Sequence, residues 1–341
     1  MSVSRRQVLY LGGAVAAGAV LIPPYAHADD PIATPITDDA SLERALPALS
    51  NWGRWGPDDE LGTLNFITAE KRLAAAALIR TGRVVPLGRE FAPQTARLRD
   101  FSYEMRVFRD DPLPEEAVSI DIVGMTCHGF ALTHVDALCH YFTPPGPYWT
   151  PTGSQAMYNG YSIDDVTPNG ALKLGIEHVG ATGIVGRGVL LDVAEIHGGP
   201  LPLGTIITVA DLEAAERAHG VRVGEGDIVF IRNGAGPANT FQNGNGLHAE
   251  CLPWLRDRRV AVLSSDSDSD VHPTVPGFDK WTLPMHMVGI PYMGLTILDN
   301  TELDGLAQAC AQEGRWEFFL SVAPWRLRGA TGDVVNPLAM F

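Results

Sequence analysis

The stretch "CHGFALTHVDALCH", residues 127–140, brings histidines and an aspartate into one short segment: His128, His134, Asp136 and His140. In an extended strand, residues two apart point to the same face and lie roughly 6.6 Å from each other. Side chains at that spacing can converge on one cation that lies roughly 2.1 Å from each ligand atom. His134 and Asp136 meet this condition, so the spacing predicts that they share a metal ion.

His128 and His140 can join this pair only if the backbone bends, because each would otherwise lie roughly 20 Å from His134. Gly129 can provide one bend, and a helical turn after Asp136 would bring His140 back. The alternative is that these histidines are separate core or surface residues, but so many ligand-type side chains in one segment favour a site. Imidazole and carboxylate ligands suit zinc, manganese or iron(II) and commonly leave a water position open for catalysis.

A second candidate is "SSDSDSD", residues 264–270, in which aspartates alternate with serines. The alternation is compatible with a calcium ion or a second metal. However, the segment lacks the EF-hand spacing that ends in glutamate, so we expect solvated loop carboxylates. Asp266 lies nearest the end of a predicted strand and is the aspartate that we expect to line a cleft.

Aromatic residues supply the candidate pocket walls. Tyr141, Phe142, Tyr148 and Trp149 follow His140 closely, and they suit either a planar substrate or ordinary packing. Trp52, in the segment "NWGRWGPDDELGTLNF", is a further pocket candidate, although such a tryptophan more often anchors a loop to the core.

Helical and extended patterns alternate along the chain. Thr68 is a plausible N-cap for the first helix, and the boxes Thr208-x-x-Asp211 and Thr301-x-x-Asp304 open two later ones. This interleaving predicts an α/β fold, with a mixed sheet flanked by helices. After a leader, we expect a single domain over 29–341, whose first part, 29–66, shows no sustained period and is an ordered arm. The predicted helices are 69–80, 209–219, 248–258 and 302–312, and the predicted strands are 83–91, 183–193, 227–232, 259–264 and 316–323.

Composition excludes several classes of protein. The net charge of −15 argues against nucleic acid or anionic membranes as partners. There is no G-x-G-x-x-G after a strand, no phosphate-binding P-loop motif and no G-x-S-x-G nucleophile motif. The cysteines form no C-x-x-C pair, and buried free thiols are the default expectation, although a Cys127–Cys139 bridge stays open.

Residues 1–28 have the layout of an export signal. Arg5 and Arg6 form a twin-arginine start, residues 7–22 are apolar, and Ala26-His27-Ala28 offers a cleavage site. An uncleaved membrane anchor is the alternative, but the apolar stretch is shorter than the roughly 20 residues that a span requires. We therefore expect a periplasmic protein without stable membrane association, exported already folded and compatible with a metal bound beforehand.

These motifs resemble the metal-dependent cyclase family, which includes bacterial kynurenine formamidases and isatin hydrolases. "THVDALCH" resembles the family's T-H-x-D-x3-H signature. The segments "LHAECLPWLRDRRVAVLSSD", "LPMHMVGIPYMGLTILDN" and "GATGDVVNPLA", together with the "NWGRWGPDDELGTLNF" arm, resemble further parts of it. The resemblance extends over most of the chain after the leader and implies a swivelling β/β/α domain, usually in homodimers or homotetramers.

The resemblance also implies residue roles. His134 and Asp136 would bind the metal, His140 would work beside it as an acid or base, and His286 and Asp299 would bind a second metal or hold the catalytic histidine. One position departs from the family: the formamidases have a histidine four residues before that of T-H-x-D, where this chain has Phe130. His128 is a candidate substitute ligand, and Phe130 a candidate wall of the substrate pocket.

The sequence therefore predicts a hydrolase that uses a divalent metal, zinc or manganese, to open a carbon–nitrogen bond of a small cyclic or aromatic amide. His140 and His286 are the candidate catalytic residues. Two alternatives stay open: a metal-free periplasmic binding or accessory protein with the same fold, and a lactone hydrolase or cyclase.

Overall fold

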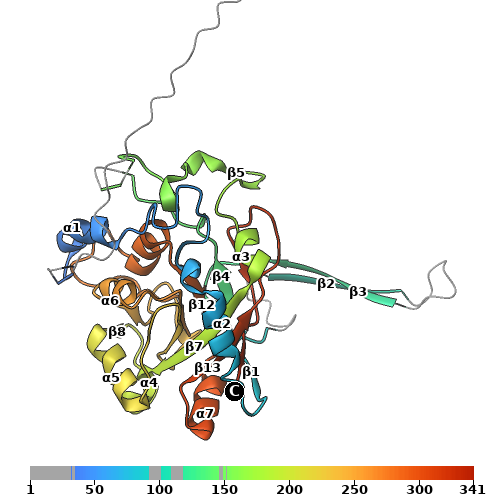
Figure 1. The fold of residues 1–341 in the computed structure, drawn as a ribbon. Coiled ribbons are helices and arrows are strands. Elements are labelled where there is room, and N and C mark those ends of the chain that lie inside the picture. Colours follow the sequence, from blue (N-terminus) through green and yellow to red (C-terminus); the bar gives the residue numbers. More distant parts are fainter. Residues whose placement is uncertain (1–31, 33–34, 92–100, 109–117, 146–148, 151) are drawn as a thin grey trace, which may run out of the picture.

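The computed structural model describes residues 32, 35–91, 101–108, 118–145, 149–150 and 152–341 (Figure 1). The predicted leader, Tyr148 and most of residues 29–34 lie outside these ranges. The described residues contain a nine-stranded mixed sheet in the order β1-β15-β13-β7-β9-β11-β12-β4-β14. Its strands are β1 (Val84–Pro86), β4 (His134–Asp136), β7 (Ile184–Asp192), β9 (Ile228–Arg232), β11 (Val262–Ser265), β12 (Thr296–Asp299), β13 (Glu317–Val322), β14 (Gly332–Val334) and β15 (Leu338–Met340).

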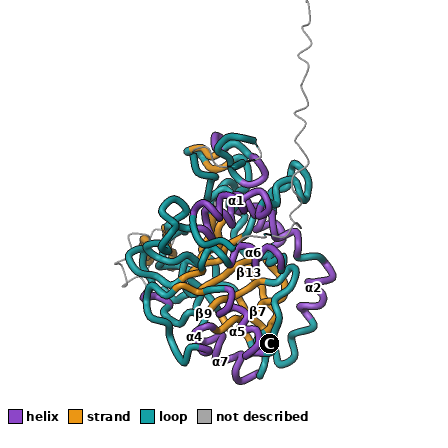
Figure 2. Tube along the Cα trace, turned by 90° about the vertical axis from the view of Figure 1, so that its left-hand side faces the viewer, coloured by secondary structure: helices purple, strands orange, loops and turns teal. Residues whose placement is uncertain are grey.

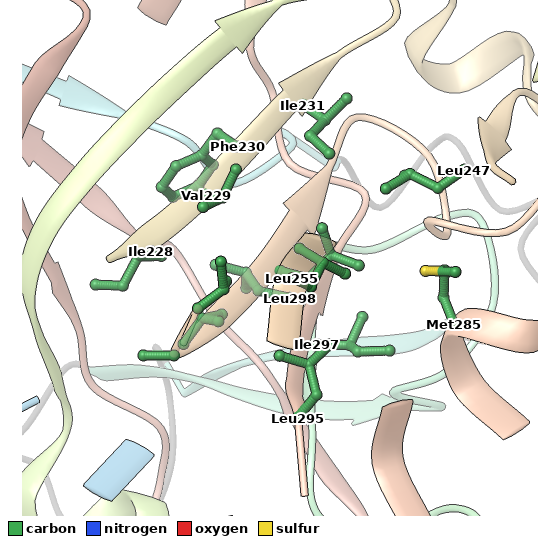
Figure 3. Close-up of a cluster of buried hydrophobic side chains, with 14 of the residues drawn as sticks. Ile228, Val229, Phe230, Ile231, Leu247, Leu255, Met285, Leu295, Ile297 and Leu298 are labelled. Carbon is green, nitrogen blue, oxygen red and sulfur yellow. The ribbon is translucent and has the colours of Figure 1, made fainter. Parts of the chain in front are cut away.

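Four neighbouring strands, β7, β9, β11 and β12, run parallel and form the middle of the sheet. Their sequences are rich in Val, Ile and Leu, which is typical of strands that are buried on both faces. Figure 3 shows the side chains of Ile228, Phe230, Ile297 and Leu298 packed together there, and all four are fully buried.

Helices cover the sheet, as Figure 2 shows, and the predicted α/β fold is confirmed. Helix α5 occupies the predicted residues and has the predicted capping box, in which Thr208 and Asp211 cap each other. The helices are α1 (Asp39–Leu49), α2 (Ala69–Ala76), α3 (Ile176–Thr182), α4 (Val193–Ile196), α5 (Val209–His219), α6 (Cys251–Asp257), the π-helix η6 (Met285–Met293) and α7 (Asp304–Glu313).

Three expectations about helices need correction. The arm contains α1, which the sequence analysis missed although Asp38 and Ser41 form a capping box and Leu42, Leu46 and Leu49 are buried along one face. Helix α7 begins after Leu303 and not after Thr301, because the Thr301 hydroxyl bonds to the carbonyl of Ser265 instead. Helix α2 ends at Ala76, before the predicted end at residue 80, and α6 is shorter than the predicted 248–258 at both ends.

Strands β2 (Phe101–Phe108) and β3 (Val118–Met125) form an antiparallel ribbon and, within the described part of the chain, pair with no other strand. Figure 1 shows this ribbon extending away from the rest of the molecule. Smaller two-stranded sheets join β8 (Ile206–Ile207) to β10 (Gly246–Leu247) and β5 (Val166–Thr167) to β6 (Gly170–Ala171), and short 3-10 turns include η1 (Gly62–Phe66).

All four cysteines are free thiols; three are buried and Cys127 is half-buried. Among the described residues, no helix combines the length and apolar character that a membrane crossing requires.

Candidate metal centre and active site

Strand β4 carries His134 and Asp136, and both side chains are buried. Because residues two apart share a face, the Nε2 atom of His134 lies 3.6 Å from Oδ1 of Asp136. The neighbouring strand β12 ends at Asp299, which is paired in register with His134. Ligand atoms of His134, Asp136 and Asp299 all lie within 4.8 Å of one another.

The carboxylates of this cluster leave two oxygens without a hydrogen-bond partner. Oδ2 of Asp136 and Oδ2 of Asp299 are buried, and neither accepts a hydrogen bond among the described residues. The other oxygen of Asp299 accepts a hydrogen bond from the Ser269 hydroxyl at 2.7 Å. A buried anionic oxygen without a partner is costly unless a cation neutralises it. The residues therefore fit a divalent metal ion.

His134 is held in the form that a metal ligand needs. Its Nδ1 atom lies 2.9 Å from the carbonyl oxygen of Leu132, which can only accept, so Nδ1 carries the hydrogen. The lone pair is then on Nε2, the atom that faces Asp136 and Asp299. A backbone carbonyl behind a histidine ligand is a common way to fix its tautomer and its ring orientation.

His128 and His140 reach the cluster because the backbone bends on both sides of β4. Gly129 has a φ of 125°, a conformation that favours glycine, and a turn closed by the bond from His140 N–H to the Ala137 carbonyl returns the chain after Asp136. The rings of His128 and His140 are stacked, with centroids 3.5 Å apart. The return is thus a hydrogen-bonded turn where a helical turn was expected.

Both nitrogens of His128 are engaged. Nδ1 donates to Oδ1 of Asp136 at 2.9 Å, and Nε2 lies 3.0 Å from the Thr331 hydroxyl. In this arrangement His128 holds the carboxylate of Asp136 through a hydrogen bond. Ligand-type atoms of His128, Asp136 and His140 also lie within 4.8 Å of one another.

His286 enters from the first turn of η6 and faces the same two carboxylates. Its Nε2 atom lies 3.3 Å from Oδ2 of Asp299 and 3.5 Å from Oδ2 of Asp136. On the other side of the ring, Nδ1 donates to Asp270 at 2.7 Å. Asp270 was not among the predicted site residues.

The charges in this cluster depend on each other. Burial opposes ionisation of Asp136, but the surrounding histidines, His140 foremost, hold the pKa of its carboxyl well below the usual value. Burial lowers the pKa of His140 to about 4, although Asp136 acts in the opposite direction. His140 is therefore a neutral imidazole at neutral pH. Burial also opposes a charge on His286, but the neighbouring carboxylates outweigh it and raise the pKa of His286 well above the usual value.

His134, His286 and Asp299 of the cluster line a pocket of about 940 Å³. Among the predicted pocket residues, Phe130 and Tyr141 line it, whereas Phe142 and Trp52 do not. Trp52 is buried in the core, and its indole N–H donates to the carbonyl of Pro291 at 2.7 Å, so it has the anchoring role that the sequence analysis favoured. The lining also includes Arg89, Phe241, Asp268 and His140.

The aspartates of "SSDSDSD" are not solvated, which corrects the expectation from sequence. Asp266, Asp268 and Asp270, which follow β11, are all buried. Asp266 accepts the backbone N–H groups of Asn233 and Gly234, Asp268 lines the pocket, and Asp270 holds His286.

A family model described as "Putative cyclase" matches residues 72–269. The crystal structure of a novel cyclase is 32% identical, with 86% of this chain and 99% of that one covered and a TM-score of 0.73. Isatin hydrolase A from Ralstonia solanacearum is 19% identical, with 80% and 97% covered and a TM-score of 0.50.

Isatin hydrolase A from Labrenzia aggregata, in a structure with benzyl benzoate, is 17% identical, with 80% and 98% covered and a TM-score of 0.51. At such identities these two structures share the fold. A search of the curated proteins finds no match. The family match spans more than half of the chain and includes the segment that bears His134 and Asp136, so the protein belongs to the cyclase family.

Proposed function

We propose that this protein is a metal-dependent hydrolase that opens the carbon–nitrogen bond of a small cyclic or aromatic amide. The observation that supports it best is the group formed by His134, Asp136 and Asp299, whose ligand atoms lie within 4.8 Å of one another. Asp136 and Asp299 each also have a buried carboxylate oxygen that accepts no hydrogen bond among the described residues. His134 and Asp299 of this group line a pocket large enough for a small substrate.

The residues would divide the work as follows. His134, Asp136 and Asp299 would hold the cation, which when bound would supply Lewis acidity toward a carbonyl and make a water more acidic. His128 keeps Asp136 in place through a hydrogen bond to its carboxylate, and Thr331 in turn holds the other nitrogen of His128. Asp270 fixes the ring of His286 so that Nε2 faces both carboxylates. Zinc and manganese both suit this mixture of nitrogen and oxygen ligands.

His140 is the proposed proton carrier. Its imidazole lies beside Asp136, lines the pocket and is neutral at neutral pH, because burial lowers its pKa to about 4. It can take a proton from the attacking water and pass it to the departing nitrogen, which leaves as an amine. A neutral histidine is needed for the first of these transfers.

The walls of the pocket favour a planar substrate. The rings of Phe130 and Phe241 meet edge to face with centroids 4.5 Å apart. The ring of Tyr141 packs against the rings of His140 and His286. Such rings offer flat apolar surfaces against which an aromatic molecule can pack. Isatin hydrolases share the fold, which is a reason to include isatin in a substrate screen.

The test is a metal-binding titration paired with a hydrolysis screen of matched cyclic amides and lactones. The protein is stripped of metal and reloaded with zinc or manganese separately. We expect turnover only after loading and a preference for amides. His134→Ala should abolish both metal binding and turnover, whereas His197→Ala, at an exposed surface histidine, should preserve both. Turnover that survives in His134→Ala would refute the assignment, and a parent protein with neither metal nor turnover would favour the accessory role.

We also propose that the protein is exported to the periplasm by the twin-arginine route. The support is the sequence of residues 1–28, with Arg5 and Arg6 ahead of an apolar stretch and an Ala26-His27-Ala28 site. Replacing both arginines by lysine should leave the protein in the cytoplasm of its host. Continued export of that variant would exclude this route.

A further inference from the structure

Asp268 and His272 form a buried pair to which the proposed function assigns no role. Oδ2 of Asp268 is hydrogen-bonded to Nε2 of His272. Asp268 is 8% exposed and His272 is 4% exposed, so both are more than nine-tenths buried. Asp268 nevertheless lines the same pocket as His140 and Asp299. A buried carboxyl group at the wall of a candidate active site is a functional candidate in its own right.

The Asp268 carboxyl has unused capacity to accept hydrogen bonds. Oδ1 is buried and accepts none among the described residues, and Oδ2 accepts one, from His272. An ionised carboxylate offers about four acceptor positions on its two oxygens. Leaving them unused in a buried place costs free energy, and a donor on a molecule bound in the pocket would offset that cost.

Other roles fit Asp268 less well. It belongs to neither group of ligand-type atoms that lie within 4.8 Å of one another in the described part of the chain, so the geometry does not make it a metal ligand. The pocket lining contains three further carboxyl groups. Asp299 belongs to the metal group, and Glu90 and Glu302 are less buried than Asp268. Asp268 is therefore the buried carboxyl of the lining that is left for a substrate.

The backbone on both sides of Asp268 is fixed. The carbonyl of Ser267 accepts the N–H of Asn300 at 2.8 Å, and the carbonyl of Ser269 accepts the N–H of Leu247 at 2.9 Å. The hydroxyl of Ser269 also donates to Asp299 at 2.7 Å. One residue thus separates Asp268 from the group that holds a metal ligand, which sets the position of its carboxyl relative to the metal centre.

His272 connects this carboxyl to the aromatic wall of the pocket. Its ring meets the rings of Phe130 and Phe241 edge to face, with centroids 5.3 and 5.5 Å apart. Its backbone N–H and carbonyl both bond to Gly244, where an added Cβ would lie 3.3 Å from Cδ2 of His272. The acidic pair and the aromatic wall therefore form one packed unit. A flat ring that packs on the wall can present an N–H at its edge to Asp268.

We propose that Asp268, oriented by His272, determines specificity by accepting a hydrogen bond from the ring nitrogen of the substrate. The inference rests on the proposed hydrolase function and narrows its substrate class to planar cyclic amides that keep an N–H. An N-substituted amide has no hydrogen to donate, and a lactone has an oxygen at that position. A site built to bond a substrate N–H rejects an analogue without it, because the buried acceptor is left unpaired.

This contact is compatible with the chemistry at the nitrogen. Water forms the new bond to the carbonyl carbon as the carbon–nitrogen bond breaks. His140 passes the proton that it took from the water to the leaving nitrogen, which keeps its original hydrogen. The product amine thus still has an N–H for Asp268 to accept.

Three planar substrates of similar size test the proposal with the zinc-loaded protein at pH 8. Burial raises the pKa of Asp268 to about 6, although the bond from His272 opposes this, so the carboxyl is ionised at that pH. Oxindole has a ring N–H, N-methyloxindole has a methyl group there, and coumaranone is the matching lactone. We expect kcat/KM of the parent to be roughly 10–100-fold higher for oxindole than for N-methyloxindole, the usual effect of a hydrogen bond to a charged group.

Asp268→Asn should remove this preference. An amide that keeps its oxygen on His272 presents an NH2 donor in place of Oδ1, so oxindole should lose most of its advantage. The kcat/KM values for N-methyloxindole and coumaranone should change little, and the zinc content should stay at the parent value. Asp266→Asn is the matched control, since its carboxyl is buried in the same segment but does not line the pocket. It should preserve the preference for oxindole.

Indole and N-methylindole give a readout without turnover, because neither has a bond that water can hydrolyse here. Isothermal titration of the zinc-loaded parent should show roughly tenfold tighter binding of indole, and Asp268→Asn should remove the difference. The comparison within the parent needs no substitution, so it holds as a test even if Asp268→Asn does not fold.

The outcomes separate this inference from the hydrolase assignment. A parent that treats N–H and N-methyl compounds alike would overturn the specificity role even if it hydrolyses both oxindoles. Loss of the preference in Asp266→Asn, or loss of zinc from Asp268→Asn, would also overturn it. A parent that hydrolyses none of the three substrates, but binds indole more tightly than N-methylindole through Asp268, would refute the hydrolase while the contact to Asp268 stands.

Discussion

The Nδ1 atom of His286 lies 2.7 Å from Oδ2 of Asp270, and the same carboxylate accepts the backbone N–H groups of Met285 and His286. Asp270 therefore does two tasks. It satisfies donors at the beginning of the π-helix η6, and it sets the direction of the imidazole that this helix carries.

Replacing Asp270 by asparagine should loosen the metal centre. The amide cannot accept all three hydrogen bonds, so His286 would lose its fixed orientation toward Asp136 and Asp299. We expect metal affinity to fall by about 10–100-fold, as for other residues that orient a metal site. Isothermal titration with zinc measures it. Asp211→Asn, which disturbs the cap of α5, serves as the control and should lower thermal stability while metal affinity stays at the parent value.

His140→Gln should separate binding from chemistry. We expect turnover to fall by about 10²–10⁴-fold, which is the usual contribution of a positioned proton carrier, while the metal stays bound. The measurement combines steady-state kinetics with metal content after gel filtration. Loss of metal in proportion to turnover would show that His140 is a ligand and not a proton carrier.

Phe130→Ala should act on substrate binding. Its ring packs against Phe241 and His272 at the pocket wall, and removing it takes away a flat surface worth about 1 kcal/mol to an aromatic ligand. We expect KM for an aromatic amide to rise roughly fivefold at that energy, with metal affinity retained. An aliphatic cyclic amide provides the comparison, since its KM should change less.

Asp266→Asn tests a buried carboxyl outside the metal centre. Burial raises the pKa of Asp266 to about 6, and the backbone N–H groups of Asn233 and Gly234 only partly offset this. The folded protein then binds this proton more tightly than the unfolded chain, so the resulting stabilisation is present at low pH and is lost as pH rises through about 6. The loss of stability caused by the substitution should therefore be about 1 kcal/mol larger at pH 5 than at pH 7. Urea unfolding at both pH values measures this difference, and an equal loss would contradict the shifted pKa.

Local patterns predicted many of the elements that surround the site. The Thr208–Asp211 box marked the start of α5, and the apolar runs marked β7, β9 and β11. The period of two along β4 placed His134 and Asp136 on one face. These features depend on neighbours in the sequence, which is why sequence alone suffices for them. Helix α1 was missed because the Pro- and Trp-rich residues that flank it obscured its apolar face.

The roles of the aspartates could not be predicted in the same way. Asp270 and Asp268 resemble solvated loop residues when only their neighbours are considered. Their burial follows from how the segment after β11 packs against η6, which begins fifteen residues beyond Asp270 and supplies the donors for its carboxylate. Trp52 was expected from its residue type to anchor a loop to the core, but its partner could not be predicted, because Pro291 lies on the same distant helix.

The register that places Asp299 opposite His134 also determines when the ion can be captured. Before strands β4 and β12 pair, the Asp299 carboxylate and the His134 imidazole lie in distant parts of an unfolded chain. The unfolded chain therefore has no preformed metal site. A shift of one residue in the register of β4 and β12 would place the ligand side chains on opposite faces of the sheet. We therefore expect the metal ion to bind late in folding, after the two strands have paired. A chelator should raise the rate of unfolding much more than it slows the collapse of the unfolded chain.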